Sequence, residues 1–432
     1  MTVASFLRSA LEWPSRKPVV SPGLYRYRRD VEGAAALFHL RVDSAGDGLL
    51  LANAAAVARL TASGVLIAKG LLEAVEPREI LHRLKKQFRG VKEATLVADV
   101  AAVRTLLAQM ERPAHGYPLL NLADPAFSPK AAPLGRPISA DVPLCAPFHS
   151  ARVLERLWQL GIPHVTFVVG QKPVAEHLLR AVEKAGDLGM ITGLRGRGSD
   201  LAHVNCLNEL AAAGLDHLDL YCLSTEEAVH DGLAGEGDSR LVNRMLRSAR
   251  KQEVCIVAQL ALVRPALPTL VKTVEQLARH GIENIALFAI GGVDDEAADQ
   301  GAMLPDEIVP AARQLIDTAE RLEVRLMVYP TVQFAPKQSL GEQVCCGPRT
   351  SGDTSIRVEP GGTVIAPRGP YRSAGNLFDD PWETIYHSEA FEAYRRRVES
   401  DTHCGQCPGL TICAADCPRD PAGWAMPTSN CP

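Results

Sequence analysis

The chain has 432 residues, of which 47% are apolar and 22% charged, and its formal net charge is −4. This length predicts two or three domains, and the composition excludes a disordered or fibrous chain. The near balance of charges gives no indication of a nucleic-acid partner or an anionic membrane surface. No apolar run reaches the ~18 residues of a spanning helix, and residues 1–16 lack a signal-peptide pattern. We therefore expect a cytoplasmic protein without a membrane span.

The first region, residues 21–112, begins with strand-like patterns and continues with helical ones. Strands are predicted at 24–29, 37–43 and 49–57, and helices at 61–73, 77–88 and 98–110. A three-stranded sheet followed by three helices indicates a small winged-helix-like module. Residues 113–149 are predicted to be a linker, because six prolines lie between Pro113 and Pro137.

The second region, residues 150–335, alternates apolar strands with amphipathic helices. The predicted strands are 164–169, 188–194, 217–223, 253–262, 284–290 and 325–331. Such βα units indicate a parallel sheet, either open or curled into a barrel, with its functional end at the carboxyl ends of the strands. The Gly-rich segment 193–200 would lie there, either as an anion site using Arg195 and Arg197 or as a plain loop. His164 and His217 lack metal-ligand spacing and are expected to be core or surface residues.

The last region, residues 343–432, holds seven of the eleven cysteines. Four follow the pattern Cys404-x2-Cys407-x5-Cys413-x3-Cys417 in a stretch rich in Gly and Pro. A segment of this kind cannot bury a core of its own, so clustered thiolates in a reducing compartment predict a metal site. A strand pair is expected around 354–358 and 363–366, followed by a helix over 381–399.

These cysteines resemble the SPASM domain that is appended to radical SAM enzymes. Cys346 precedes Gly362 at the interval found in this domain, and Cys431 matches its last ligand position. The segment Val358-Glu359-Pro360-Gly361-Gly362 is also typical of the domain. The resemblance implies one complete [4Fe–4S] cluster, with zinc as the alternative metal, held by Cys404, Cys407, Cys413 and Cys431. A second cluster would retain Cys346, Cys417 and neighbouring Cys345. This second cluster would be either incomplete or absent, because Pro367 stands at a ligand position.

The first region resembles the PqqD-like element that recognises peptides in ribosomal-peptide maturation. The likeness rests on residues 38–43 and 48–54. In such elements a leader peptide adds a strand to the exposed sheet edge beside the last helix. The resemblance maps the edge to residues 49–57 and the helix to 98–110. The implied peptide-binding residues are Leu49, Leu51, Asn53, Val103 and Leu107.

The middle region resembles the latter part of a radical SAM barrel, through residues 157–165 and 213–217. Radical SAM enzymes hold their catalytic cluster on Cys-x3-Cys-x2-Cys after the first barrel strand. Here that strand and its loop are predicted to be deleted, leaving the single cysteine Cys145. The family's Gly-Gly-Glu-Pro loop has become Gly170-Gln171-Lys172-Pro173, which reverses the local charge. S-adenosylmethionine is therefore not expected to bind.

The sequence thus predicts an α/β protein with a winged-helix-like PqqD domain, an incomplete radical SAM (β/α) partial barrel and a C-terminal SPASM iron–sulfur domain. The implied function is non-catalytic. The chain would recruit a peptide substrate or leader peptide, or act as a scaffold, beside an active radical SAM enzyme or another subunit. Two alternatives remain: an electron-transfer subunit of a larger complex, and an enzyme with altered chemistry in the barrel.

Overall fold

The structure is a computed structural model, and it describes twelve stretches of the chain. These are residues 18–31, 34–53, 56–111, 135–144, 150–170, 175–202, 207–251, 254–292, 294–329, 331–348, 354–365 and 373–392. The chain folds as two compact units, the first comprising residues 1–120 with 158–163 and the second residues 121–157 with 164–432. Within the described stretches, no helix combines the length and the apolar character needed to cross a membrane.

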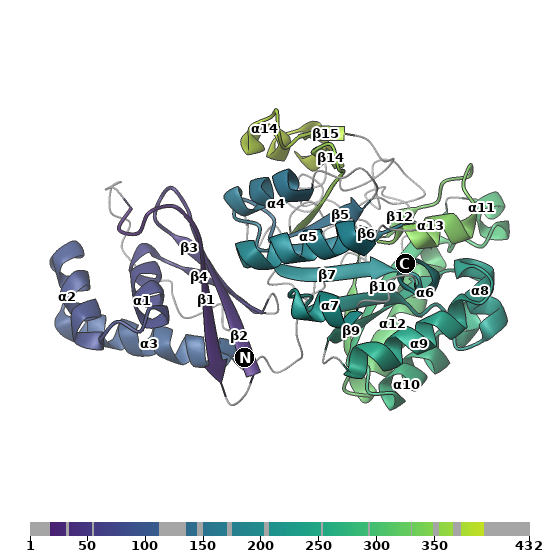
Figure 1. Ribbon diagram of the computed structural model, residues 1–432, viewed down its shortest axis with the longest axis horizontal. Coiled ribbons are helices and arrows are strands. Elements are labelled where there is room, and N and C mark those ends of the chain that lie inside the picture. The colour runs from purple at the N-terminus through teal and green to yellow at the C-terminus, as the bar shows by residue number, and fades with distance from the viewer. Residues whose placement is uncertain are drawn as a thin grey trace. The chain divides into compact units, whose positions relative to one another are not determined.

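The first unit is a four-stranded antiparallel sheet with three helices packed on one face (Figure 1). Its elements are β1 (Gly23–Val31), β2 (Ala34–Val42), β3 (Gly48–Ala52), β4 (Ala56–Leu60), α1 (Ala62–Leu72), α2 (Pro77–Gln87) and α3 (Glu93–Glu111). Alternate strand residues such as Phe38, Leu40 and Leu50 face the helices and form one buried core with Val65 and Leu84. The residues between them, such as Leu49 and Leu51, point to the other face of the sheet and are buried as well.

The third predicted strand, 49–57, is two strands in the structure. Asn53 turns the chain between them with a φ of 51°, a conformation that Asn tolerates better than most residues. The backbone N–H of Asn53 donates to Leu37 O at 2.8 Å, and the side-chain oxygen of Asn53 accepts from Leu37 N at 2.7 Å. As a result β3 pairs with β2 on one side and β4 on the other. The expectation that Leu49 and Leu51 lie on a sheet edge is therefore wrong, because β4 forms that edge.

The second unit contains a sheet of eleven strands, of which β5 to β11 run parallel. These strands are β5 (Ser139–Leu144), β6 (His164–Val169), β7 (Ile191–Gly196), β8 (His217–Tyr221), β9 (Cys255–Leu262), β10 (Asn284–Gly291) and β11 (Arg325–Val328). Six of them confirm the predicted parallel strands to within a few residues. The short β12 (Val332–Gln333) pairs with β10.

The strand β5 corrects the expectation that the first barrel strand is deleted. It pairs in parallel with β6 through all six of its residues and lies inside the segment predicted to be a linker. Pro143 and the proline-rich stretch before it conceal the strand in the sequence, because proline is unusual in a central strand.

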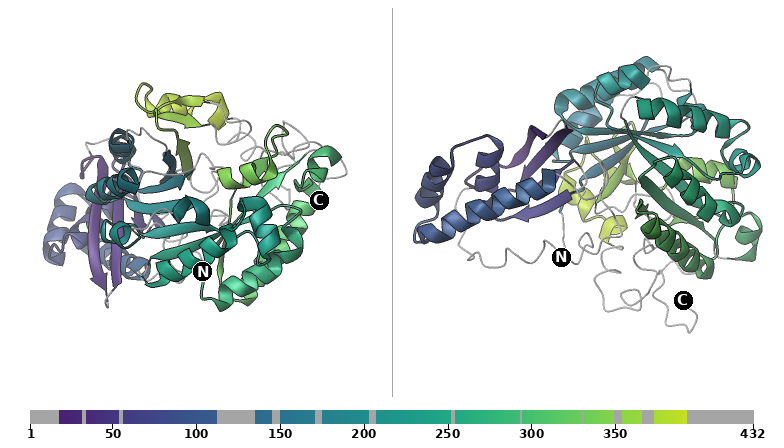
Figure 2. Two further views of the ribbon diagram at one scale, coloured as in Figure 1. Left: turned by 45° about the vertical axis from the view of Figure 1, so that its right-hand side comes forward. Right: turned by 90° about the horizontal axis from the view of Figure 1, so that it is seen from below.

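Helices connect the parallel strands and cover their outer face (Figure 2). The longer ones are α4 (Ser150–Gln159), α5 (Ala175–Leu188), α9 (Asp238–Lys251), α10 (Leu270–Arg279) and α12 (Pro305–Arg321), and the shorter ones are α6 (Gly198–Leu201), α7 (Leu207–Ala212), α8 (Glu227–Ala234), the 3-10 turn η3 (Leu267–Thr269) and α11 (Asp295–Asp299). The strand residues beneath them, such as Phe167, Leu218 and Leu287, are apolar and buried.

The C-terminal part continues the same sheet. The strand β13 (Ser355–Val358) pairs in parallel with β5, and β14 (Thr363–Ile365) and β15 (Ser373–Asn376) follow antiparallel. The helix α13 (Leu340–Cys346) precedes them. The predicted helix 381–399 is represented by α14 (Trp382–Tyr386), and residues beyond 392 lie outside the described stretches.

Replacing Asn53 by alanine should lower the free energy of unfolding by about 1–3 kcal/mol. The substitution leaves the partly buried Leu37 amide without its acceptor and forces alanine into a left-handed conformation. Urea unfolding of the full chain measures the change, and Asn53→Gly serves as the comparison that relieves the backbone strain alone. Equal stability of Asn53→Ala and the parent chain would contradict this role for the turn.

Candidate functional site

The two faces of the parallel sheet differ in chemistry. Strands of a parallel sheet are usually apolar on both faces, because both are buried. Here the outer face under the helices follows that rule, whereas the inner face of β5 to β9 carries polar side chains. Along β5 to β11 the inward residues include Asp141, Thr166, Arg195, Asp219 and Gln259, all of them buried. This inner face is the candidate functional site.

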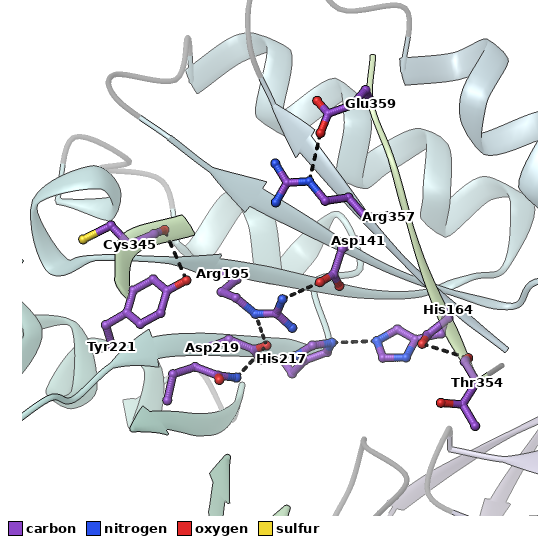
Figure 3. Close-up of polar contacts among 12 residues, drawn as sticks. Asp141, His164, Arg195, His217, Asp219, Tyr221, Cys345, Thr354, Arg357 and Glu359 are labelled. Carbon is purple, nitrogen blue, oxygen red and sulfur yellow. Dashed lines mark hydrogen bonds and ion pairs between the residues drawn. The ribbon is translucent and has the colours of Figure 1, made fainter. Parts of the chain in front are cut away.

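Arg195 on β7 lies at the centre of the inner face, between two carboxylates (Figure 3). Its Nη1 donates to Asp141 Oδ2 at 2.6 Å, and its Nε donates to Asp219 Oδ2 at 3.2 Å. Burial opposes the charge of Arg195, but Asp141 and Asp219 raise its pKa well above the ordinary value. The guanidinium thus stays charged and holds β5, β7 and β8 together through ion pairs that are shielded from water.

Asp219 connects this ion pair to two histidines. Its Oδ1 lies 2.7 Å from His217 Nδ1, and His217 Nε2 lies 2.8 Å from His164 Nε2 on β6. Burial by itself would raise the pKa of Asp219, but His217 and Arg195 outweigh it and hold the pKa below the ordinary value. The ionised Asp219 can only accept from His217 Nδ1, and a hydrogen bond between the two Nε2 atoms needs one of them to donate and the other to accept. Asp141, Arg195, Asp219, His217 and His164 form one chain of contacts, which we call the interior network.

Gly193 makes room for this arrangement. A Cβ atom at this position would lie 2.0 Å from His217 Cε1, so the imidazole ring occupies the space that any side chain would need. The ring can therefore extend from β8 past β7 to reach His164 on β6. The sequence analysis treated these histidines separately as core or surface residues. The structure places both in the core and joins them.

Gln259 on β9 adds a donor and an unsatisfied acceptor to the inner face. Its Nε2 lies 3.3 Å from Asp219 Oδ2, and the residue is fully buried. Its Oε1 has no hydrogen-bond partner in the described part of the chain. A buried carbonyl oxygen without a donor costs free energy unless water or a ligand supplies one.

The carboxyl end of β8 is covered by the end of α13. The hydroxyl of Tyr221 donates to Cys345 O at 3.4 Å, and burial raises the Tyr221 pKa. Gly347, with a φ of 78°, follows α13 and has no Cβ; such an atom would lie 2.5 Å from the Tyr221 oxygen. The end of α13 therefore lies against the carboxyl end of β8.

The Gly-rich segment is largely a strand. Residues 191–196 form β7, so Arg195 points inward and is bound by two carboxylates rather than facing an anion. Arg197 lies at the start of α6 and forms a bidentate pair with Asp200 at 2.8 Å. Both arginines carry internal partners, and the segment is neither a plain loop nor an open anion site.

The connection between β5 and α4 is short. The strand ends at Leu144 and the helix begins at Ser150, which leaves residues 145–149 between them. This stretch contains one cysteine, Cys145, and lies outside the described residues. A Cys-x3-Cys-x2-Cys motif spans eight residues and does not fit into this connection. The residues present therefore do not match the thiolate set of a catalytic radical SAM cluster.

Two of the seven predicted metal ligands are described. Cys345 is partly buried, which raises its pKa to about 12, and Cys346 is exposed at the end of α13. Within the described stretches, no three side chains of ligating type come together around a common point. The remaining cysteines, Cys404, Cys407, Cys413, Cys417 and Cys431, lie beyond residue 392, so the ligand assignments stay predictions.

The predicted peptide-binding residues all lie inside the first unit. Val103 and Leu107 on α3 belong to its apolar core, and Leu49, Leu51 and Asn53 are also buried. The C-terminal end of α3 is tied to β1 by an ion pair between Arg29 and Glu111. These side chains support the sheet, and its edge at β4 is formed by neighbouring residues.

No family model matches this chain. Its fold is a mixed α/β fold whose parallel sheet resembles that of radical SAM enzymes. The crystal structure of Streptococcus suis SuiB bound to S-adenosylmethionine superposes with a TM-score of 0.50 and 10% identity, over 85% of this chain and 91% of SuiB. The structure of SuiB bound to its precursor peptide SuiA gives a TM-score of 0.49 at 9% identity, over 85% and 91% of the two chains.

A sequence relative is the PqqA peptide cyclase of Bradyrhizobium diazoefficiens. It is 22% identical over 273 residues, which cover 59% of this chain and 68% of the cyclase. The sequence and fold comparisons agree on a radical SAM-like architecture.

Replacing Asp219 by asparagine should lower the free energy of unfolding by about 3–5 kcal/mol at neutral pH, because Arg195 loses one of two buried counter-charges. Since the native pKa of Asp219 is lowered, its contribution is complete above the ordinary carboxyl pKa of about 4 and is lost as the pH falls through the native pKa. The difference between Asp219→Asn and the parent chain should therefore shrink in acid.

Urea unfolding at a series of pH values measures this effect. The exposed Asp187→Asn is the matched control and should change stability by less than about 0.5 kcal/mol. A difference that stays constant with pH, or a variant as stable as the parent, would show that Asp219 is not the carboxylate that holds the network.

Proposed function

We propose that this chain is a non-catalytic relative of peptide-modifying radical SAM enzymes and that it recruits a peptide for an active partner enzyme. The observation that carries the proposal is the β5–α4 connection. With five residues and one cysteine, it cannot hold three thiolates around an iron atom that keeps an open coordination position for S-adenosylmethionine.

The interior of the second unit supports the same conclusion. Arg195 is paired with both Asp141 and Asp219, and the two histidines are bound to the same network. Tyr221 and Gly347 close the carboxyl end of β8. The charged side chains at the centre of the sheet are thus engaged with each other, and they hold neighbouring strands together in place of a cofactor.

A peptide substrate is supported by the name of the relative, a peptide cyclase. The PqqD-like resemblance gives the first unit the role of peptide recognition, and the iron–sulfur cluster proposed on Cys404, Cys407, Cys413 and Cys431 would stabilise the C-terminal segment. The active partner would supply the radical chemistry that this chain lacks.

The edge strand β4 is the proposed peptide-docking site. Leu51 on β3 faces His39 on β2 and Val57 on β4. Leu37, two residues before His39, directs its amide and carbonyl groups toward β3, so His39 also bonds toward β3 and Leu51 toward β2. The amide and carbonyl of Val57 therefore point away from β3, toward an added strand.

Replacing Val57 by proline should weaken peptide binding about tenfold or more, because it removes an outward donor and distorts the adjoining backbone. The β3–β4 hydrogen bonds do not use this amide, so the sheet should remain intact. Fluorescence anisotropy with labelled peptides encoded beside the gene measures the affinity. Val57→Ala, which keeps the amide, should bind like the parent chain, and thermal unfolding checks that both variants are folded.

Binding of Val57→Pro with the affinity of Val57→Ala would place the peptide elsewhere. A complete lack of peptide binding by the parent chain would remove the recruitment function itself.

A second candidate function is binding of a small ligand by the inner face. It is favoured by the buried Gln259 Oε1, which lacks a donor while its amide contacts Asp219. Isothermal titration of the anaerobic protein with S-adenosylmethionine tests it. Saturable heat that disappears in Gln259→Leu would favour this function over the scaffold role.

A further inference from the structure

The helix α2 and the turn after it carry a concentrated positive charge. Six cationic side chains (Arg78, Arg83, Lys85, Lys86, Arg89 and Lys92) are exposed between residues 78 and 93, against two acidic ones, Glu79 and Glu93. The difference of six and two leaves four positive charges, in a chain whose total is −4. The local charge is therefore opposite to that of the whole protein.

Two of the six cations are paired and four are not. Arg83 pairs with Glu79 and Lys85 pairs with Glu93, both at 2.8 Å. Arg78, Lys86, Arg89 and Lys92 form no ion pair with any described residue. A solvated helix face kept only for solubility usually intersperses acids at spacings of three and four residues, because like charges there destabilise the helix.

Two exposed apolar side chains follow these cations closely in the sequence. Val91 in the turn and Val97 on α3 are 39% and 47% exposed, and they are the large hydrophobic side chains that stand out from the described surface. Val91 lies between Arg89 and Lys92 in the sequence. We call these two valines and the six cations the α2 patch.

The α2 patch does not lie on the sheet, because α1 and α3 separate α2 from the strands. Ile80 and Leu84 on its inner side are buried, and the Ile80 side chain packs against Gly70 of α1, where a Cβ would lie 2.9 Å from it. The helix packs on α1 and α3, which in turn cover the sheet (Figure 1). A peptide added to the β4 edge would occupy a different layer of this unit.

We propose that the α2 patch is a docking surface for an acidic segment of a partner protein that also presents apolar side chains. Charge complementarity selects the acidic segment, and the two valines select one with apolar groups beside its carboxylates. The patch contains no exposed Phe, Tyr or Trp on which bases could stack, so a nucleic acid is the less suited polyanion. The proposal is independent of the peptide site at β4.

The test uses the full chain and a labelled synthetic peptide of Glu and Leu, with its Gln and Leu counterpart and a short DNA duplex as comparisons. The Glu peptide should bind, and added salt should weaken its binding. Combined replacement of Arg78, Lys86, Arg89 and Lys92 by Glu should weaken binding about tenfold or more. Val91→Ser with Val97→Ser should weaken it about threefold or more.

The matched control reverses four exposed, unpaired cations of the second unit, Arg244, Arg247, Lys272 and Arg313, and should leave binding within about twofold of the parent chain. Thermal unfolding confirms that each variant is folded, and Val57→Pro should bind the Glu peptide normally. No binding of the Glu peptide, equal binding of the Gln peptide, equal loss in the control variant or tighter binding of the duplex would each overturn the proposal.

Discussion

The inner face of the second unit depends on a buried guanidinium that is paired with two carboxylates on opposite sides. Removing these charges from water is costly, and the cost is offset only while Arg195 contacts Asp141 and Asp219 together. The contact fixes the positions of β5, β7 and β8 relative to one another. It also orients His217, and through it His164, because Asp219 uses its second oxygen for the imidazole.

The same constraint bears on function. In an α/β fold, polar side chains at the carboxyl ends of strands usually mark the place of substrate and cofactor. In this chain Arg195, near the carboxyl end of β7, is bound by Asp141 and Asp219, the end of α13 lies against the carboxyl end of β8, and the connection after β5 is too short for a three-cysteine cluster. The proposed scaffold role follows from these three features, each of which arises from different residues. Peptide recruitment then belongs to the first unit, where β4 offers an edge, and contact with a partner belongs to the α2 patch.

Much of the architecture could be predicted from the sequence, because the spacing of apolar residues along a strand or helix indicates which side chains are buried. The six central strands and the three helices of the first unit have strong patterns and were located. Two features of the strands could not be predicted from the sequence: the division of one strand at Asn53 and the presence of β5. Asn53 divides an apolar run with a single left-handed residue, and β5 is concealed by Pro143.

The interior network was missed for another reason. Its members come from four strands, and only the parallel register brings Asp141, Arg195 and Asp219 together. The available signal was the presence of charged and histidine residues within otherwise apolar strands, since a buried parallel strand seldom carries them unpaired. Gly193 gave a second signal, although its role depends on the ring of a residue 24 positions later. The cysteine spacing predicted a metal site, and the division of the cysteines into ligand sets rests on the resemblance to the SPASM domain.

The central claim is that the second unit cannot bind the iron–sulfur cluster whose open iron site cleaves S-adenosylmethionine. The direct measurement is the amount of 5′-deoxyadenosine formed by the anaerobically reconstituted and reduced protein with S-adenosylmethionine, analysed by liquid chromatography and mass spectrometry. The account predicts no more product than reductant forms with S-adenosylmethionine alone, even when iron and sulfide are bound. Product that accumulates with time and protein concentration, and disappears when Cys145 is replaced by alanine, would contradict it.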